Sequence, residues 1–379
     1  MRIGLFCYNY PPSPRQGGIE DYTERLAKAL VKKGVDVIVV ASGPEQESGT
    51  DEHLTILRSP EPWNRRWARR WQGELKSRAV DLILLQYSPA MFENPQRLAW
   101  PLLTSTFPSV TAFHTLWGGP KRNYFAAWRL LRASDAIIAT NSEILYLLER
   151  HLPWYVERTV FIPIGANITP DRLEGDKDTA GQYGISDDKL VLSYFGMTYP
   201  GKGMKTLFET ASILKRKFDI EFQLLCIGGG VSDDEPYRAA RAQMVAEAEL
   251  DQEIRWTGRV PASHVSALLA ASDIVVLPYT SGVSDRRGSL MAALAHGKPV
   301  VTTPPRIPIS HFVNGKHMLW PDTHSPDELA RAIKSLRDDA SLRATLKAGA
   351  LELSSRLDWE RIAADMECLF ARTLDAQTT

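Results

Sequence analysis

Short apolar runs alternate with helical patterns along nearly the whole chain, and this alternation restricts the possible folds more than any other feature. In the first half, strands are expected at residues 2–8, 35–40, 80–87, 110–114 and 136–140. Strands that are apolar throughout and separated by helices indicate a parallel sheet covered by helices on both faces. We therefore predict an α/β fold.

The same pattern restarts after residues 162–188, a segment rich in Gly, Pro and Asp. Strands are expected at 191–195 and 222–227, with a helix between them that carries apolar residues on one face. A chain of 379 residues also favours two domains over one. We predict two doubly wound domains facing each other, with ligands bound in the cleft outside the carboxyl ends of the strands.

Composition excludes several classes of protein. Lys+Arg and Asp+Glu are both 45, so the net charge is zero, which argues against general nucleic-acid binding. The three cysteines lie far apart, show neither disulfide nor zinc spacing, and indicate a reducing compartment. The first apolar run is too short for a signal peptide, and no apolar run reaches about 18 residues. We expect a cytoplasmic protein.

Residues 272–303 carry the clearest indication of a ligand. This stretch reads as a buried strand, a polar loop, a short helix of small residues and a second strand. Arg286 and Arg287 end the loop, and the helix is expected to begin at Gly288 and Ser289. Backbone N–H groups at a helix start attract anions, and adjacent guanidinium groups strengthen that attraction. The stretch therefore predicts a site for a phosphorylated ligand.

Three other positions are candidates, and each also has an ordinary structural interpretation. Gly17-Gly18 precede the first helix, where glycine lets a ligand approach the backbone, but a plain loop is an equal reading and no GxGxxG motif is present. Lys202 lies between glycines ahead of a helix and can reach a phosphate, or it is a solvated loop lysine. His114 ends a strand and could bind a ligand hydroxyl, assist proton transfer, or serve the structure only.

A basic, tryptophan-rich segment stands apart from these. Trp63, Trp67 and Trp71 are four residues apart, and residues 61–78 hold six basic and two acidic side chains. Such a helix could lie on an anionic membrane or hold a lipid-phosphate acceptor. The alternative, which we favour, is a surface helix docked on the protein through its tryptophans.

The order of several motifs resembles one enzyme family. Gly-Gly before the first helix is followed by FHT, IPIGAN, FGMTYPGKG, TGRV, ASDIVVLP and ALAHGKPVVTT. Over nearly the whole chain this is similar to the family-four retaining glycosyltransferases, whose GT-B fold has two facing Rossmann-like domains and a central cleft. The resemblance implies an acceptor-binding domain at 1–165, a linker at 166–188 and a donor-binding domain at 189–357. The final helix, within 358–379, would pack back onto the first domain.

The resemblance also implies roles for individual residues. Lys202 matches the diphosphate-binding lysine, Gly17-Gly18 the glycine loop near the donor phosphates, and His114 the histidine near the transferred sugar. Ile164 stands in the hinge motif where asparagine is usual. The residues expected to bind the donor are Gly17, Gly18, Gly196, Lys202, Ser284, Asp285, Arg286, Arg287, Gly288 and Ser289, and those expected to be catalytic are His114, Lys202 and Arg287.

The chain departs from the family at three positions. Ser284 and Ala292 stand where the family usually has two glutamates, and Met197 stands where it has an arginine. Asp285 could replace the first carboxylate, and the two arginines that follow it could restore the positive charge lost at Met197. We therefore expect a rewired donor site that still works.

The expected activity is retaining transfer of a sugar from a nucleoside diphosphate sugar to a glycan or lipid-linked acceptor, in polysaccharide or glycolipid assembly. No metal-ligand, paired-carboxylate or Ser/His/Asp pattern is visible, and neither a metal nor a cofactor is expected. Two alternatives are a non-catalytic GT-B subunit that binds a partner enzyme or glycan, and a sugar-nucleotide epimerase. Peripheral contact with the inner face of a membrane is an additional hypothesis.

Overall fold

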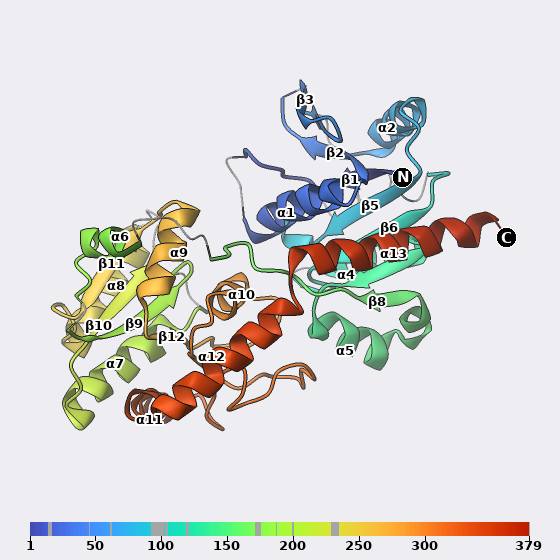
Figure 1. Ribbon diagram of the computed structural model, residues 1–379. Helices are drawn as coiled ribbons and strands as arrows, with labels where there is room; N and C mark the ends of the chain where they lie inside the picture. Colours follow the sequence, from blue (N-terminus) through green and yellow to red (C-terminus); the bar gives the residue numbers. More distant parts are fainter. Residues whose placement is uncertain are drawn as a thin grey trace. The chain divides into compact units, whose positions relative to one another are not determined.

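The structure, a computed structural model, describes residues 1–378 except 14–16, 45, 61–62, 92–101, 103–104, 119–120, 171–175, 187, 199–200 and 229–234. The chain divides into two compact units (Figure 1). Unit 1 comprises Met1–Asn167 and Leu357–Thr379, and unit 2 comprises Ile168–Arg356. Each unit holds one sheet with helices on both faces, and each is described by itself below.

Unit 1 is built on an eight-stranded sheet in the order β3-β4-β2-β1-β5-β6-β7-β8. Its strands are β1 (Arg2–Phe6), β2 (Asp36–Ser42), β3 (Gln46–Asp51), β4 (Leu54–Ser59), β5 (Leu82–Tyr87), β6 (Ser109–Phe113), β7 (Ala136–Ala139) and β8 (Thr159–Phe161). The predicted parallel α/β pattern is confirmed, with one exception at the edge, where β3 pairs antiparallel with β4.

Helices cover both faces of this sheet (Figure 1). One face packs against α1 (Gly18–Lys32) and the final helix α13 (Trp359–Thr378). The other face packs against α2 (Arg65–Ser77), α4 (Lys121–Ala133) and α5 (Ser142–His151). The short helices η1 (Pro89–Met91) and η3 (Pro153–Arg158) complete the unit. The chain therefore returns to unit 1 at its end, where Trp359 Nε1 donates a hydrogen bond to the carbonyl of Ala166 at 2.7 Å.

The tryptophans of the basic segment lie inside unit 1. Trp63, Trp67 and Trp71 are only 2%, 0% and 8% exposed, and the rings of Trp63 and Trp67 stack with centroids 4.6 Å apart. The tryptophans therefore do not face a membrane or an acceptor lipid, and the helix is docked on the sheet through them, which is the interpretation that we favoured. The apolar stripe of α2 meets the sheet, so its arginines are left on the outer side.

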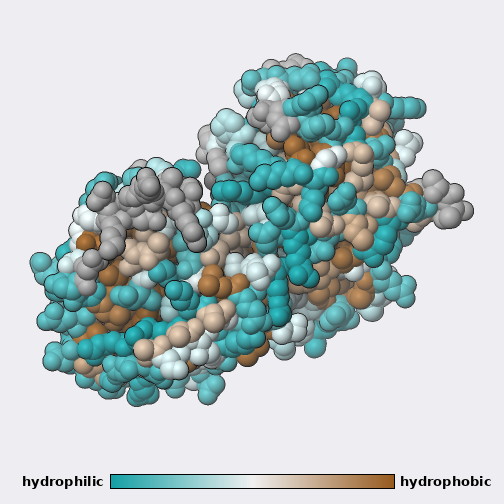
Figure 2. Space-filling view, in the orientation of Figure 1, coloured by the Kyte–Doolittle hydropathy of each residue, from teal (hydrophilic) through white to brown (hydrophobic). Residues whose placement is uncertain are grey.

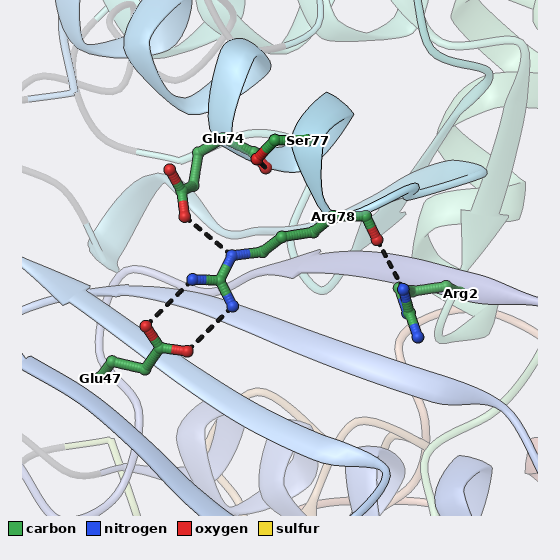
Figure 3. Close-up of polar contacts among 5 residues, drawn as sticks. All are labelled: Arg2, Glu47, Glu74, Ser77 and Arg78. Carbon is green, nitrogen blue, oxygen red and sulfur yellow. Dashed lines mark hydrogen bonds and ion pairs between the residues drawn. The ribbon is translucent and has the colours of Figure 1, made fainter.

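Figure 3 shows how the end of α2 holds the edge strand β3. The guanidinium of Arg78 donates to both carboxylate oxygens of Glu47 at 2.9 and 3.0 Å, and its Nε donates to Glu74 at 2.8 Å. The carbonyl of Arg78 accepts from Arg2 Nη1 at 2.7 Å. One side chain thus connects β3 with α2, although such partly exposed pairs each contribute only about 1 kcal/mol or less.

Unit 2 is built on a five-stranded parallel sheet in the order β11-β10-β9-β12-β13. Its strands are β9 (Leu190–Phe195), β10 (Phe222–Ile227), β11 (Ile254–Gly258), β12 (Ile274–Leu277) and β13 (Val300–Thr302). Its helices are α6 (Asp176–Gln182), α7 (Met204–Phe218), α8 (Glu235–Ala248), α9 (Ala262–Ala271), α10 (Gly288–Ala295), α11 (Pro326–Asp338) and α12 (Ala340–Ser355). Part of the expected linker, 166–188, forms α6, which packs against α9. Within the described ranges, no helix has the length and apolar character needed to cross a membrane.

Candidate active site

The topology of unit 2 brings two loops together at one edge of the sheet. From β9 the chain passes through α7 to β10 on one side, whereas β12 lies on the other side of β9. The loops that follow β9 and β12 therefore leave the sheet at a point where the strand order reverses, which is where ligands bind in sheets of this kind. The loops touch: Thr280 Oγ1 donates to the carbonyl of Gly201 at 2.8 Å.

Gly203 makes this approach possible. It precedes α7 with φ of +78°, in the left-handed region that favours glycine, and a Cβ atom at this position would overlap the carbonyl oxygen of Pro278. The backbones of the two loops are thus in direct contact. This contact places Lys202, in the first loop, beside the second loop.

A group of three cations lies at the contact. Burial, followed by the positive charges of Arg287 and Arg286, lowers the pKa of Lys202 to about 8. The Arg287 guanidinium lies 4.7 Å from the ring centroid of Tyr279 and donates to Ser281 Oγ. Holding these positive charges together costs free energy, and a bound anion would offset that cost. The sequence prediction that Lys202 and the two arginines form one anion site fits this geometry.

The start of α10 borders the same group. Arg287 is the N-cap residue and provides no side-chain cap, and Gly288 is exposed. Ser289 exchanges a hydrogen bond of 2.7 Å with Tyr279 Oη, which fixes the ring under Arg287. Gly196, at the end of β9, is also close, because a Cβ atom on it would lie 4.0 Å from that of Ser289. The first-turn N–H groups of α10 add to the positive potential next to the guanidinium groups.

Asp285 is the residue that we considered as a replacement for the first of the two missing glutamates. Its side chain is covered, at 1% exposed for the residue, and its Oδ2 lies 3.5 Å from His311 Nε2. Burial lowers the pKa of His311, and the charge of Asp285 opposes that shift. Ser284 is half-buried beside it, and Ala292 lies inside α10 at 1% exposed. His311 was not identified from the sequence, because it comes from a distant loop without a motif.

In unit 1, His114 directly follows β6 and is also largely buried. Its Nε2 lies 2.7 Å from Oε1 of Gln86, a fully buried residue of the neighbouring strand β5. Because an amide oxygen only accepts, Nε2 carries the proton and Nδ1 is left as an acceptor. Burial lowers the pKa of His114 to about 3. The imidazole is therefore neutral near pH 7, which favours a hydrogen-bonding role over the proton donation that we considered from the sequence.

Tyr22, on α1, holds the other side of this histidine. The rings of Tyr22 and His114 meet edge to face with centroids 4.8 Å apart, and Tyr22 also contacts Trp359 at 5.3 Å. The sequence singled out neither Tyr22 nor Gln86. A polar residue inside an apolar strand, as Gln86 is, was the one available signal.

The glycine pair lies at the start of α1. Gly17 is its N-cap residue, and the Gly17 N–H donates to the Glu20 carboxylate at 3.0 Å. Burial raises the pKa of Glu20. A Cβ atom on Gly18 would meet nothing within 4 Å, so open space surrounds this position. The N–H group of Gly17, in the loop that the resemblance places near the donor phosphates, therefore already has an acceptor on the first turn of α1.

We predict that Gln86 positions His114 for the reaction. In a Gln86→Leu variant the buried Nε2–H loses its acceptor, which costs about 1–3 kcal/mol, so kcat/KM should fall about tenfold or more. In the wild-type protein, kcat/KM should show no ionisation of His114 between about pH 5 and pH 8. Steady-state kinetics over this pH range would measure both effects.

A Gln86→Glu variant is the matched control. It keeps an acceptor oxygen, and its carboxylate should raise the pKa of His114, so an acidic limb should appear in the pH profile. If Gln86→Leu kept normal kcat/KM, or lost activity only in proportion to lost folded protein, the positioning role would be wrong.

The described residues contain no group of three or more His, Cys, Asp or Glu side chains arranged to hold a metal ion. Residues 16–169 match the family described as Glycosyltransferase Family 4, and residues 189–339 match Glycosyl transferases group 1. D-inositol 3-phosphate glycosyltransferase of Corynebacterium glutamicum is 25% identical in an alignment that covers 98% of this chain and 96% of that protein.

Solved structures show the same fold over the whole chain. Sucrose-phosphate synthase from Thermosynechococcus elongatus superposes with a TM-score of 0.77 at 19% identity, covering 99% of both chains. Anabaena HepE, solved in complex with UDP and glucose, superposes with a TM-score of 0.76 at 18% identity, covering 99% of this chain and 100% of that one. At such identities these likenesses concern the fold alone.

Proposed function

Since the chain belongs to the family-four glycosyltransferases, has the GT-B fold and transfers a sugar from a nucleotide sugar, we propose that its donor diphosphate binds to Lys202, Arg286 and Arg287. The observation that supports this assignment is the group of three cations at the point where the strand order of unit 2 reverses. Family four is a retaining and metal-independent family, so side chains and helix N–H groups must supply the positive charge.

The reaction breaks the bond between the anomeric carbon and the phosphate oxygen. Negative charge develops on the departing diphosphate as this bond breaks. Lys202, the two arginines and the first N–H groups of α10 stabilise that charge in a site organised before the reaction. The departing oxygen then takes the proton of the acceptor hydroxyl while that hydroxyl bonds to the same face of the anomeric carbon. No separate general base is required.

His114 acts in this proposal as a neutral hydrogen-bonding group. Its Nε2–H donates a hydrogen bond to Gln86, so Nδ1 is the ring atom that can accept a hydrogen bond from a substrate hydroxyl. Its lowered pKa keeps that lone pair available over the whole physiological range.

We assign the acceptor to unit 1 and propose a glycan or a lipid-linked molecule, used in polysaccharide or glycolipid assembly. The family itself leaves the acceptor open, since one relative is named for an inositol phosphate and a structural neighbour for sucrose phosphate synthesis. For the nucleotide we propose uridine diphosphate, because HepE, which shares the fold, was solved with UDP and with UDP-glucose.

Calorimetric titration with UDP, GDP, ADP and dTDP tests the donor assignment. UDP is expected to bind with a dissociation constant in the micromolar range and the other three more weakly. Binding of another nucleotide would correct the base and leave the diphosphate site standing. If none bound, the proposal of sugar transfer would have to give way to that of a non-catalytic subunit, which the alanine at position 292 favours. Product analysis with donor alone would reveal an epimerase.

A further inference from the structure

Exposed aromatic side chains gather on one side of unit 1. Tyr124, Phe125 and Trp128 of α4 are 43%, 49% and 41% exposed, and the side continues with the exposed Tyr146 of α5 and Trp154 of η3. Among the other residues that the structure describes, Trp256 of unit 2 is the one further large aromatic with comparable exposure. Large exposed apolar areas on a protein mark contact surfaces, so this concentration calls for a partner.

The inner and outer sides of helix α4 differ in their surroundings. Its inner side buries Ala127, Leu130 and Leu131 against the sheet. On its outer side, Phe125 and Trp128 stack with centroids 5.8 Å apart, and the Arg129 guanidinium lies 5.7 Å from the Phe125 centroid. The outer side of an ordinary surface helix is polar, whereas this one is aromatic and basic.

The aromatic area extends beyond α4. Tyr124 contacts Trp117 with ring centroids 5.7 Å apart, and Trp117 contacts His151, the last residue of α5, at 5.3 Å. The two helices are therefore joined at this surface by ring contacts.

The sequences of α2 and α4 carry an excess of positive charge. The sequence of α4 has four basic residues and no acidic one, and that of α2 has five basic residues and one acidic, whereas the whole chain has no net charge. Both helices pack on one face of the sheet. Arg66 and Arg69 of α2 and Arg132 of α4 are exposed there. Helix α5, with two acidic residues and one arginine, adds no such excess.

We propose that the outer sides of α2 and α4, here called the α2–α4 face, dock on an anionic lipid bilayer. Tryptophan and tyrosine rings favour the boundary between headgroups and acyl chains, and arginines bind the lipid phosphates. The excess positive charge is spread over two helices and so covers a wide area. An anionic bilayer complements a wide positive area, which supports it as the partner. The tryptophans of α2 only support that helix from beneath, while α4 supplies the rings that reach the lipid. This proposal does not depend on the sugar-transfer reaction.

Flotation with lipid vesicles at low salt tests the charge part. The full chain should bind vesicles of phosphatidylcholine mixed with phosphatidylglycerol, and should not bind vesicles of phosphatidylcholine alone. Replacing Arg66, Arg69 and Arg132 together with glutamine should weaken binding about a hundredfold, since each basic residue contributes about fivefold near such a surface. A matched control, Arg361→Gln with Arg372→Gln, removes exposed charges from α13 on the opposite face of the same sheet and should bind normally. Figure 2 shows the side of unit 1 with α1 and α13, where hydrophilic residues are interspersed with hydrophobic areas.

The aromatic part has its own test. Phe125→Ser with Trp128→Ser should reduce binding to the same mixed vesicles by about tenfold or more, through lost burial of apolar surface. Val313→Ser, at an exposed apolar residue of unit 2, should leave binding unchanged. All substituted side chains are exposed, so thermal melting should confirm intact folding in each variant.

Three results would overturn the proposal. The first is a wild-type chain that ignores mixed vesicles at low salt, and the second is binding that survives both sets of substitutions. The third is a dimer in analytical ultracentrifugation that dissociates when Phe125 and Trp128 are replaced, which would make this face a contact between two copies of the chain.

Discussion

Replacing Lys202 with alanine is expected to lower kcat/KM for sugar transfer by about 10²–10³-fold, equivalent to roughly 3–4 kcal/mol of transition-state stabilisation. Lys202 is surrounded by protein and by two arginines, so its charge acts in a partly dehydrated site where electrostatic interactions are strong. Steady-state kinetics with the donor identified by calorimetry would measure the effect. Arg287→Ala should act in the same direction.

The pH dependence of nucleotide binding provides a second measure of the same role. The pKa of Lys202 is about 8 in the free protein, and a bound diphosphate should raise it because the opposite charge stabilises the ammonium form. Nucleotide affinity in wild-type protein should therefore decrease from about pH 7 to about pH 9.5 as the lysine loses its proton. A Lys202→Met variant should bind more weakly at pH 7 and lose that dependence.

The stability of the Lys202→Ala variant distinguishes a diphosphate-binding role of Lys202 from a structural one. Because the folded-state pKa of Lys202 lies below its unfolded value of 10.5, the charged form is disfavoured in the fold. Wild-type stability should increase as pH rises from about 8 to about 10.5, and Lys202→Ala should be at least as stable as wild type at pH 7. Loss of activity without loss of stability is thus the expected outcome.

Lys205→Ala is the matched control for these measurements. Lys205 lies three residues further along, on the first turn of α7, and its side chain is 76% exposed. Its removal should change kcat/KM little. If Lys202→Ala and Lys205→Ala behaved alike, the assignment of the diphosphate to the three cations would be wrong.

Gly203→Ala is expected to destabilise unit 2 by about 4 kcal/mol or more, combining a left-handed backbone with an overlap inside the fold. The added methyl group would collide with the carbonyl oxygen of Pro278, so the loops after β9 and β12 would have to separate. The backbone at Pro278 cannot move aside as a flexible side chain could. Chemical denaturation would report the free energy of unfolding.

Gly315→Ala isolates the clash from the backbone conformation. Gly315 has φ of +77°, almost the same as the +78° of Gly203, but a Cβ atom there would meet nothing within 4 Å. The Gly315→Ala substitution should lower the free energy of unfolding by only about 1–2 kcal/mol. Equal destabilisation in the two variants would show that the loops are not in the contact described.

Local patterns were sufficient for the central strands of both sheets. Strands such as β10, predicted at 222–227 and found as Phe222–Ile227, are apolar throughout, and burial of a continuous apolar run leaves few alternatives. The edge pair β3 and β4 was not predicted. Its anchor, the contact of Arg78 with Glu47, joins residues 31 positions apart that carry no local signal of their own.

The sequence by itself determined the alternating fold, the family and the two loops that carry Lys202 and the arginines, because periodicity and loop position depend on neighbouring residues. Only the tertiary structure decided which faces are covered. It buried the tryptophans of α2 and exposed the single tryptophan of α4, turned Asp285 towards His311, and joined His114 to Gln86. Burial and pairing depend on which distant segments the sheet brings together, and these environments set charge state and accessibility.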